Sequence, residues 1–472
     1  MSRTLRGYTD NSYNSSPSRL TRQITWGGYV MFSGLDRKQK EAVGLLSIGT
    51  FLEYFDLMLY VHMAILLNDI FFPKVDPDTK LLLTASTFCT TYILRPFGAL
   101  IFGYIGDHYG RKVSVVITTG IMAVSCLVMA NLPTYDQIGI VAAWIMITCR
   151  MIQGLSSMGE VVGALLYLTE YIKVPMRYMA VATIPIFCDL GTLGALLVGT
   201  LVTSFGYSWR VAFWIGTIVA VVGFWARLAL RETPEFVDAK KRISHIQESA
   251  SITFDKTYRP LEKVNRKSSV SLFLMECTWP LCCYFAYFYC GELLKTNYGY
   301  TAEEVIHQNL VVSMITLIFC IIRAYLCKFF HPLVILKYRL IISSFIFLIC
   351  PIWLDHATDG FSIGILQALI TSFSADCKFA SSAIYQHFPI FQRFKTAAFL
   401  YALSRALTYV LTSFGLIYLI NQLGNIGLLL AMGLTTIATG YGISHFFYLE
   451  MKQGLFSLER TKICHLLKKE NA

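Results

Sequence analysis

Long runs of apolar residues, separated by short polar segments, recur along the chain. A helix needs about 20 apolar residues to cross the roughly 30 Å of hydrocarbon in a bilayer. Irregular backbone is not tolerated against lipid, so each run of this kind is predicted to be a helix. Twelve runs qualify: residues 42–71, 79–105, 112–131, 137–168, 178–204, 208–230, 269–294, 305–328, 334–354, 361–388, 396–421 and 425–449.

The polar segments divide these runs into two equal sets. Residues 1–41 are rich in Ser, Asn and Arg, lack the apolar core of a secretory signal, and are expected to form a tail. The long segment 231–268 separates six runs in 42–230 from six in 269–449, and a second tail follows over 450–472. Two six-helix halves, related by an axis along the membrane normal, are typical of one large class of secondary transporters.

The basic residues indicate the orientation of the bundle. Residues 1–41 contain seven Lys and Arg, and residues 227–268 contain ten, whereas the connections 131–136 and 421–425 contain none. With twelve spans, both tails and the central segment fall on the same side of the membrane. Lys and Arg accumulate in cytoplasmic loops, so both termini are predicted to be cytoplasmic.

Composition agrees with a membrane protein and excludes several other classes. Hydrophobic types make up 55% of the chain and charged types 15%, against about 25% charged in soluble domains. The net charge of +11 could suggest a nucleic-acid partner, but the bases lie in short segments between apolar runs, so topology explains them and no nucleic acid is expected. The 13 scattered cysteines form no CxxC pair and are interpreted as small buried residues.

Two sequence motifs of common enzymes are missing from the chain. There is no GxxxxGK[ST] or HExxH pattern, which argues against an ATP-driven pump and against a zinc-dependent protease of the HExxH class. The chain is therefore predicted to be a non-enzymatic protein that needs no cofactor and no metal.

One compact charged stretch, GYIGDHYGRK at 103–112, interrupts the apolar runs. Small residues allow close helix packing, a glycine allows a sharp turn, and an acid can pair with bases or with a helix N-terminus. The stretch resembles the loop motif of the major facilitator superfamily, which implies a cytoplasmic latch that holds two halves together in one state. A plain charged turn is the alternative. The matching residues are Gly103, Asp107, Gly110, Arg111 and Lys112.

Other stretches resemble the metabolite:proton symporter family, which includes carriers for proline/betaine, 2-oxoglutarate, shikimate and citrate. They read FLEYFDLMLY, ILRPFGALIFG, RMIQGLSSMGEVVGALLYLTEY, SWRVAFWIG and, in the second half, FPIFQRFKTAA. The resemblance is good over about 45–240 and thin afterwards. Between spans eight and nine the family's second charged loop is replaced by CIIRAYLCKFFHPLVILKYRL, without its Gly and Asp, so latching is expected to be asymmetric.

Ionisable residues inside the spans are candidates for a binding site, because each costs on the order of 2.5–3.5 kcal/mol in a membrane. Glu53 and Asp56 share one face of the first span, and Arg95 lies in the second. Arg150 and Glu160, ten residues apart, share a face of the fourth. Acids can exchange protons there and arginine suits a substrate carboxylate. The alternative is a set of ion pairs that only hold helices together.

The second half adds Glu276, Asp376, Lys378 and Arg405 to these charges. Asp376 and Lys378 stand two apart in the tenth span, so on a helix they would not face one another, and each is expected to find a partner elsewhere. They are interpreted either as substrate ligands or as members of structural pairs. Two histidines inside spans, His62 and His387, could also relay protons.

The resemblance implies a proton-coupled symporter in a bacterial inner membrane that takes up a small polar organic solute, and the protein is expected to be a monomer. Osmolytes such as proline or betaine are the first expectation and dicarboxylates such as 2-oxoglutarate the second. Two alternatives are a sugar carrier or drug exporter of another branch of the superfamily, and a transporter-like sensor that does not transport.

Overall fold

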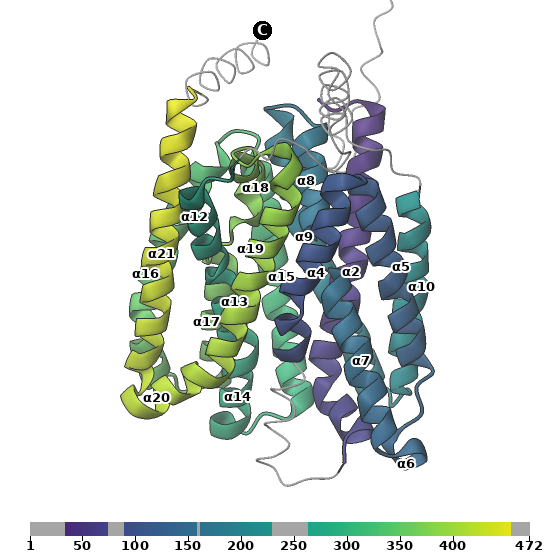
Figure 1. Ribbon diagram of the computed structural model, residues 1–472. Coiled ribbons are helices and arrows are strands. Elements are labelled where there is room, and N and C mark those ends of the chain that lie inside the picture. The colour runs from purple at the N-terminus through teal and green to yellow at the C-terminus, as the bar shows by residue number, and fades with distance from the viewer. Residues whose placement is uncertain (1–33, 74–88, 158–160, 229–262, 455–472) are drawn as a thin grey trace, which may run out of the picture.

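The computed structural model describes residues 34–73, 89–157, 161–228 and 263–454 of the chain. Within these ranges the regular elements are helices, and the long ones run side by side as a bundle (Figure 1). Most of the predicted tails 1–41 and 450–472 and of the central loop 231–268 lies outside the described residues, and so do residues 79–88 of the second predicted span.

The helices that precede the central loop are called the N-terminal half. They are α2 (Arg37–Phe71), α4 (Arg95–His108), α5 (Arg111–Ala130), α6 (Tyr135–Ile138), α7 (Ile140–Ser156), α8 (Val161–Tyr171), α9 (Met176–Ser204) and α10 (Trp209–Leu228).

The helices that follow the loop are called the C-terminal half, and two of its spans contain a π-helical segment. They are α12 (Arg266–Glu276), α13 (Thr278–Cys283), the π-helix η2 (Tyr284–Tyr289), α14 (Cys290–Tyr298), α15 (Ala302–Leu326), α16 (Pro332–His356), α17 (Gly360–Phe373), the 3-10 helix η3 (Cys377–Ala380), α18 (Ser381–Tyr385), α19 (Ile390–Val410), the π-helix η4 (Leu411–Leu416), α20 (Ile417–Leu423) and α21 (Asn425–Lys452).

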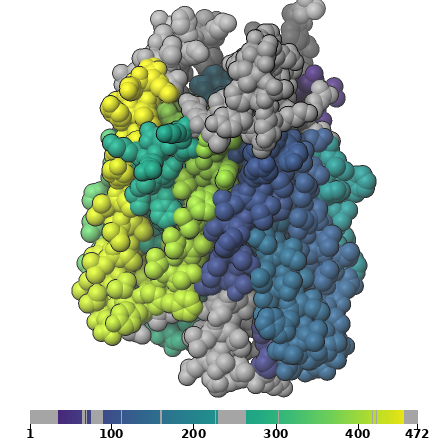
Figure 2. Space-filling model, in the orientation of Figure 1, coloured from purple at the N-terminus to yellow at the C-terminus, as the bar shows by residue number. Residues whose placement is uncertain are grey.

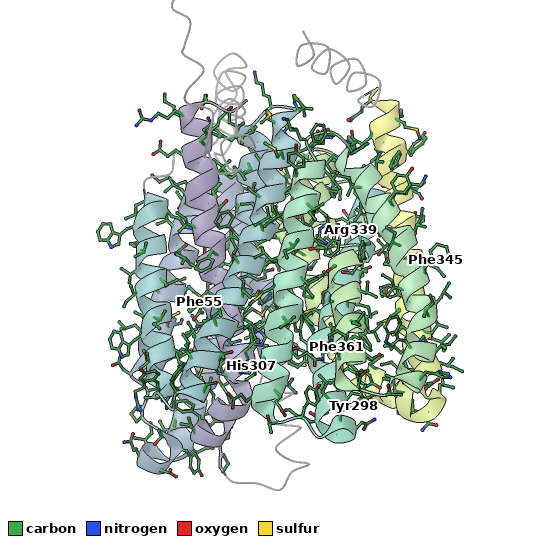
Figure 3. The ribbon with its side chains drawn as sticks, turned by 180° about the vertical axis from the view of Figure 1, so that it is seen from behind. Phe55, Tyr298, His307, Arg339, Phe345 and Phe361 are labelled. Carbon is green, nitrogen blue, oxygen red and sulfur yellow. The ribbon has the colours of Figure 1, made fainter. Side chains whose placement is uncertain are left out.

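These helices follow the twelve predicted spans. In the described ranges, ten helical segments are long and apolar enough to cross a membrane, and α10 contributes a shorter apolar stretch, Trp209–Trp225. The remaining span is the second, whose described part includes α4. Apolar side chains also cover the outside of the bundle: Ile437 is 74% exposed and Phe345 63%. Figure 3 shows Phe345 at the outer edge of the C-terminal half, where lipid is its natural solvent.

The two halves join most closely at one end of the molecule. The helix α2 begins and α21 ends at this end, called the terminal end, whereas α6 and α20 lie at the opposite end (Figure 1). One hydrophobic core at the terminal end contains residues of both halves, for example Leu165 of α8 and Phe394 of α19. Two further cores belong to one half each, one around Phe71 and Phe213 and the other around Leu294.

The seam between the halves follows α4 and α19, which pack against each other. In the space-filling view the blue surface of the N-terminal half meets the lime surface of the C-terminal half along this line (Figure 2). A Cβ atom at Gly103 would stand 2.7 Å from Cα of Lys395, so a side chain there would collide with the backbone of α19. The glycine therefore permits the close approach of the two helices.

The tenth span is not a continuous helix, and this overturns one expectation. The helix α17 ends at Phe373, Ser374 leaves the helical region with ψ of 144°, and Asp376 adopts an extended conformation before η3 begins. Because the backbone turns here, Asp376 and Lys378 do face each other, with Nζ of Lys378 3.6 Å from Oδ2 of Asp376. The prediction that each would need a partner elsewhere was wrong, since it assumed helical geometry.

Two buried arginines stabilise this break. Arg323 of α15 donates to the carbonyl oxygen of Ser372, and Arg339 of α16 donates to that of Ser374. Arg339 also reaches the carbonyl oxygen of Asp376 at 3.3 Å, and it lies among the helices of the C-terminal half (Figure 3). Carbonyl groups at the end of a helix have no partner within the helix, so cations that donate to them compensate for the lost backbone bonds.

Candidate functional site

A cavity lies between the two halves and takes side chains from both. The N-terminal half contributes chiefly α2 and α9, and the C-terminal half contributes the segment α13–η2, α15, η3 and α19. The lining residues are Tyr54, Leu57, Met58, Val61, His62, Tyr92, Arg95, Asp189, Thr192, Trp279, Cys283, Tyr287, Phe288, Ser313, Thr316, Lys378, Tyr401, Arg405 and Tyr409.

Aromatic rings make up much of this lining. The π-helical turn η2 supplies Tyr287 and Phe288, and insertions of this kind are frequent at functional sites. Across the seam, the rings of Tyr92 and Tyr409 lie with their centroids 4.3 Å apart. Rings with polar tips can surround a small solute and also attract a cation through their faces.

Two cations of the C-terminal half reach the cavity with a carboxylate beside them. Arg405 on α19 donates through Nη1 to Oε2 of Glu276 on α12 at 2.8 Å, and its guanidinium lies 3.3 Å from the centroid of the Tyr401 ring. Lys378 pairs with Asp376, as described above, and its Nζ lies 3.3 Å from the hydroxyl of Tyr54 on α2. The second pair therefore contacts the other half through Tyr54.

The N-terminal half contributes two charges to the lining, Arg95 and Asp189. Arg95 is 3% exposed and its guanidinium stacks on the Tyr92 ring at 4.1 Å. Asp189 on α9 is partly exposed and makes no ion pair with the residues that the structure describes. These two groups thus bring opposite charges to the same cavity.

A separate polar cluster lies behind the cavity, inside the N-terminal half. Gln153 on α7 donates to Oδ2 of Asp56 at 2.8 Å and accepts from Nη1 of Arg150 at 2.9 Å, so it joins the acid to the base. Cys126 on α5 donates to the other oxygen of Asp56 at 2.9 Å. The Arg150 guanidinium stacks on the ring of Tyr60 at 3.9 Å. Asp56 and Arg150 are both buried, and neither lines the cavity.

The predicted site residues are therefore distributed over two places. Arg95 and Lys378 line the cavity and Asp376 supports Lys378, whereas Asp56 and Arg150 form the cluster behind it. Glu53 is buried on α2 and does not line the cavity. Glu160 lies outside the described residues.

Sequence reasoning missed several members of the site. Asp189 stands as an isolated acid within the predicted span 178–204, and the rule that selected Arg95 could have found it. Trp279 and Tyr401 gave no such signal, because aromatic residues are common on lipid-facing surfaces as well. Their position in the cavity depends on how the helices pack.

The charged stretch 103–112 lies on the seam at the terminal end. Asp107, which is 2% exposed, accepts hydrogen bonds from the backbone N–H groups of Phe394 at 3.3 Å and Lys395 at 2.9 Å on α19. The two halves are thus connected through the N-terminal turns of α19, where a negative charge is favoured. Gly110 has φ of 124°, a conformation that glycine adopts without strain.

The other two residues of the motif begin the next helix. Arg111 opens α5, and Lys112 follows it in the first turn, where its side chain is half-buried. A second polar contact closes the seam nearby: Nη1 of Arg393 lies 3.3 Å from Oε1 of Glu170 on α8. The terminal end of the bundle is therefore held by charged contacts as well as by the shared hydrophobic core.

Comparison with known proteins places the chain among transporters. A family model of the Major Facilitator Superfamily matches residues 46–377. The proline/betaine transporter of Escherichia coli (strain K12) is 34% identical over 209 residues, which is 43% of this chain and 42% of that protein. The glycine betaine/proline/ectoine/pipecolic acid transporter OusA of Dickeya dadantii (strain 3937) is 32% identical over the same length. The chain thus matches less than half the length of these relatives.

Solved structures extend the likeness to the whole bundle. The proton:xylose symporter XylE bound to 6-bromo-6-deoxy-D-glucose superposes with a TM-score of 0.70 at 14% identity, covering 85% of this chain and 94% of that one. The transporter FucP in the outward conformation gives a TM-score of 0.63 at 12% identity, with 87% and 99% covered. At such identities the likeness shows the fold alone, and it confirms the predicted all-α membrane architecture.

Proposed function

Because the chain belongs to the major facilitator superfamily and is a multi-pass secondary transporter, we propose that it is a proton-coupled symporter for a small zwitterionic solute. Proline and betaine are the first solutes to test, since the curated relatives carry these names. The solute would bind in the cavity between the halves and reach either side of the membrane in turn, as in other transporters built from two related halves.

The balance of charges in the cavity favours a zwitterionic solute. Three cations line it, and three carboxylates either line it or pair with those cations, so their formal charges sum to zero. The cations are Arg95, Lys378 and Arg405, and the carboxylates are Asp189, Asp376 and Glu276. A neutral solute with two opposite charges keeps this balance. A dicarboxylate, the second candidate, would leave two uncompensated negative charges in a buried site, which is costly.

The proton site that we propose is the cluster of Asp56, Gln153 and Arg150. Asp56 is a buried acid, and Gln153 links it through two hydrogen bonds to the base Arg150. Such an acid can change its protonation state as water gains or loses access to it. The cluster lies between α2, α5 and α7, so rearrangement of the N-terminal half would alter its surroundings.

The contacts at the terminal end supply the gate of this mechanism. The Asp107 and Arg393 contacts hold the halves together there, so a solute would enter from the opposite end. We place the terminal end in the cytoplasm because α2 begins there, directly after the base-rich residues 1–41 of the sequence. The membrane would be a bacterial inner membrane, and a single chain contains both halves of the cavity, so a monomer suffices.

Uptake into membrane vesicles tests the proposal directly. Vesicles that contain the protein and an imposed proton gradient, acid outside, should accumulate radiolabelled proline or betaine above the level of empty vesicles. Accumulation should stop when an ionophore collapses the gradient, and 2-oxoglutarate should not accumulate. Accumulation that does not depend on the proton gradient would disprove proton coupling. Accumulation of 2-oxoglutarate alone would disprove the proposal that the solute is a zwitterion.

A further inference from the structure

The three cations that line the cavity differ in their partners. Lys378 and Arg405 each stand beside a carboxylate, at 3.6 Å and 2.8 Å. Arg95 makes no ion pair with any described residue, and its Nε and Nη2 atoms are buried without a hydrogen-bond partner. Arg95 is thus the cavity cation whose charge the described part of the protein leaves uncompensated.

The contact of Arg95 with Tyr92 leaves the Nε and Nη2 donors of the guanidinium available. The Tyr92 ring lies 4.1 Å from the guanidinium carbon and so covers a face of the planar group. Stacking of this kind does not use the N–H bonds, which point outward in the plane of the guanidinium. Two parallel N–H groups match the two oxygens of a carboxylate, the arrangement that arginine forms most readily with an anion.

Burial strengthens the case for an anionic ligand. Arg95 is 3% exposed, and an ionised group taken out of water without a partner is costly. A ligand that brings a carboxylate to Arg95 removes this cost, whereas a ligand without one leaves it in place. A cation held in this condition therefore favours carboxylate-bearing ligands over analogues of the same shape that lack the charge.

Arg95 also lies close to the seam between the two halves. The Tyr92 ring on which it stacks packs against Tyr409 of α19, in the other half. A carboxylate bound to Arg95 would therefore lie beside the seam, next to residues of both halves. The opposite charge of the solute can then face Asp189, the lining acid without an ion pair among the described residues.

We infer that Arg95 binds the carboxylate of the solute and determines specificity for carboxylate-bearing solutes. This inference rests on the proposed function, because it names the group that recognises one end of the zwitterion. It assigns Lys378 and Arg405 a different task, since their charges are already balanced within the protein.

Equilibrium binding to the purified full-length protein tests the assignment with two matched pairs of ligands. Betaine and choline share a trimethylammonium group, but choline lacks the carboxylate; proline and prolinamide differ in the same way. Loss of one partner of a buried charge pair costs 2–5 kcal/mol, so wild type should bind the acid of one pair about 30-fold or more tighter than its analogue. Arg95→Gln should abolish this preference while binding of the analogue is retained.

The retained binding of choline or prolinamide shows that Arg95→Gln is folded, and Arg95→Lys should keep part of the preference. Arg210→Gln is the matched control, because Arg210 on α10 donates to the carbonyl oxygen of Leu132 and does not line the cavity. This change should alter the affinity for neither member of a pair. An unchanged preference in Arg95→Gln, or an equal loss of both members of a pair, would overturn the inference even if uptake is normal. If wild type binds none of the four ligands, the proposed solute class is wrong and the inference falls with it.

Discussion

The contact between Asp107 and α19 offers the sharpest test of how the two halves are held together. The carboxylate accepts two backbone hydrogen bonds from the other half, from Phe394 and Lys395. Asp107→Asn keeps the size of the side chain but removes its charge and replaces one acceptor oxygen by an N–H₂ group. That group would face a backbone donor, so at most one of the two bonds can persist.

The expected magnitude follows from these two bonds. A hydrogen bond to a charged group contributes about 1.5–3 kcal/mol and a neutral one about 0.5–1.5 kcal/mol. Loss of the charge and of one bond should therefore cost the closed seam about 2 kcal/mol, which corresponds to roughly a 30-fold shift in the equilibrium between closed and open terminal ends. Solute preference should not change, since Asp107 does not line the cavity.

Hydrogen exchange and uptake together measure this effect. The amides of residues 390–400, at the start of α19, should lose protection in Asp107→Asn, because opening of the seam exposes them. The rate of uptake should fall, with the order of preferred solutes preserved. Asp136→Asn is the control, since Asp136 is an exposed acid in α6 at the opposite end. Unchanged protection, or altered solute preference at an unchanged rate, would refute the reasoning.

Three further predictions concern the other charged contacts. Asp56→Asn should abolish uptake driven by a proton gradient yet preserve exchange of labelled for unlabelled solute; loss of both would exclude a role limited to the proton. Asp376→Ala leaves Lys378 buried without its counter-ion and should destabilise the protein by about 3–5 kcal/mol. The midpoint of thermal unfolding in detergent measures this loss, and the double change with Lys378→Ala should recover part of it. Arg393→Gln, which removes the ion pair with Glu170, should loosen the seam as Asp107→Asn does, and a normal pattern of hydrogen exchange would contradict this.

The candidate site shows where sequence reasoning succeeds and where it stops. Arg95 could be selected because a charged side chain in an apolar span is costly, so it is expected to face a cavity or a partner. The same rule selected Asp56 and Arg150, but it could not tell that they lie behind the cavity. That distinction depends on the direction in which α2 and α7 face, which follows from their packing and not from their own composition.

The pair of Asp376 and Lys378 marks a more specific limit. On a continuous helix, a spacing of two residues places these side chains on different faces. The prediction failed because the segment is not a continuous helix. The break after Phe373 is stabilised by Arg323 and Arg339, which come from two other helices. No pattern within residues 361–388 contains that information.

The sequence by itself determined the spans of this protein and the division into two sets of six, because transfer of apolar side chains from water to lipid depends on local composition alone. Only the tertiary structure decided which charges meet. Arg405 and Glu276 are separated by 129 residues, and Asp107 and Lys395 by 288. The energy of such a contact depends on distance and burial, and these are set when the helices of both halves pack together.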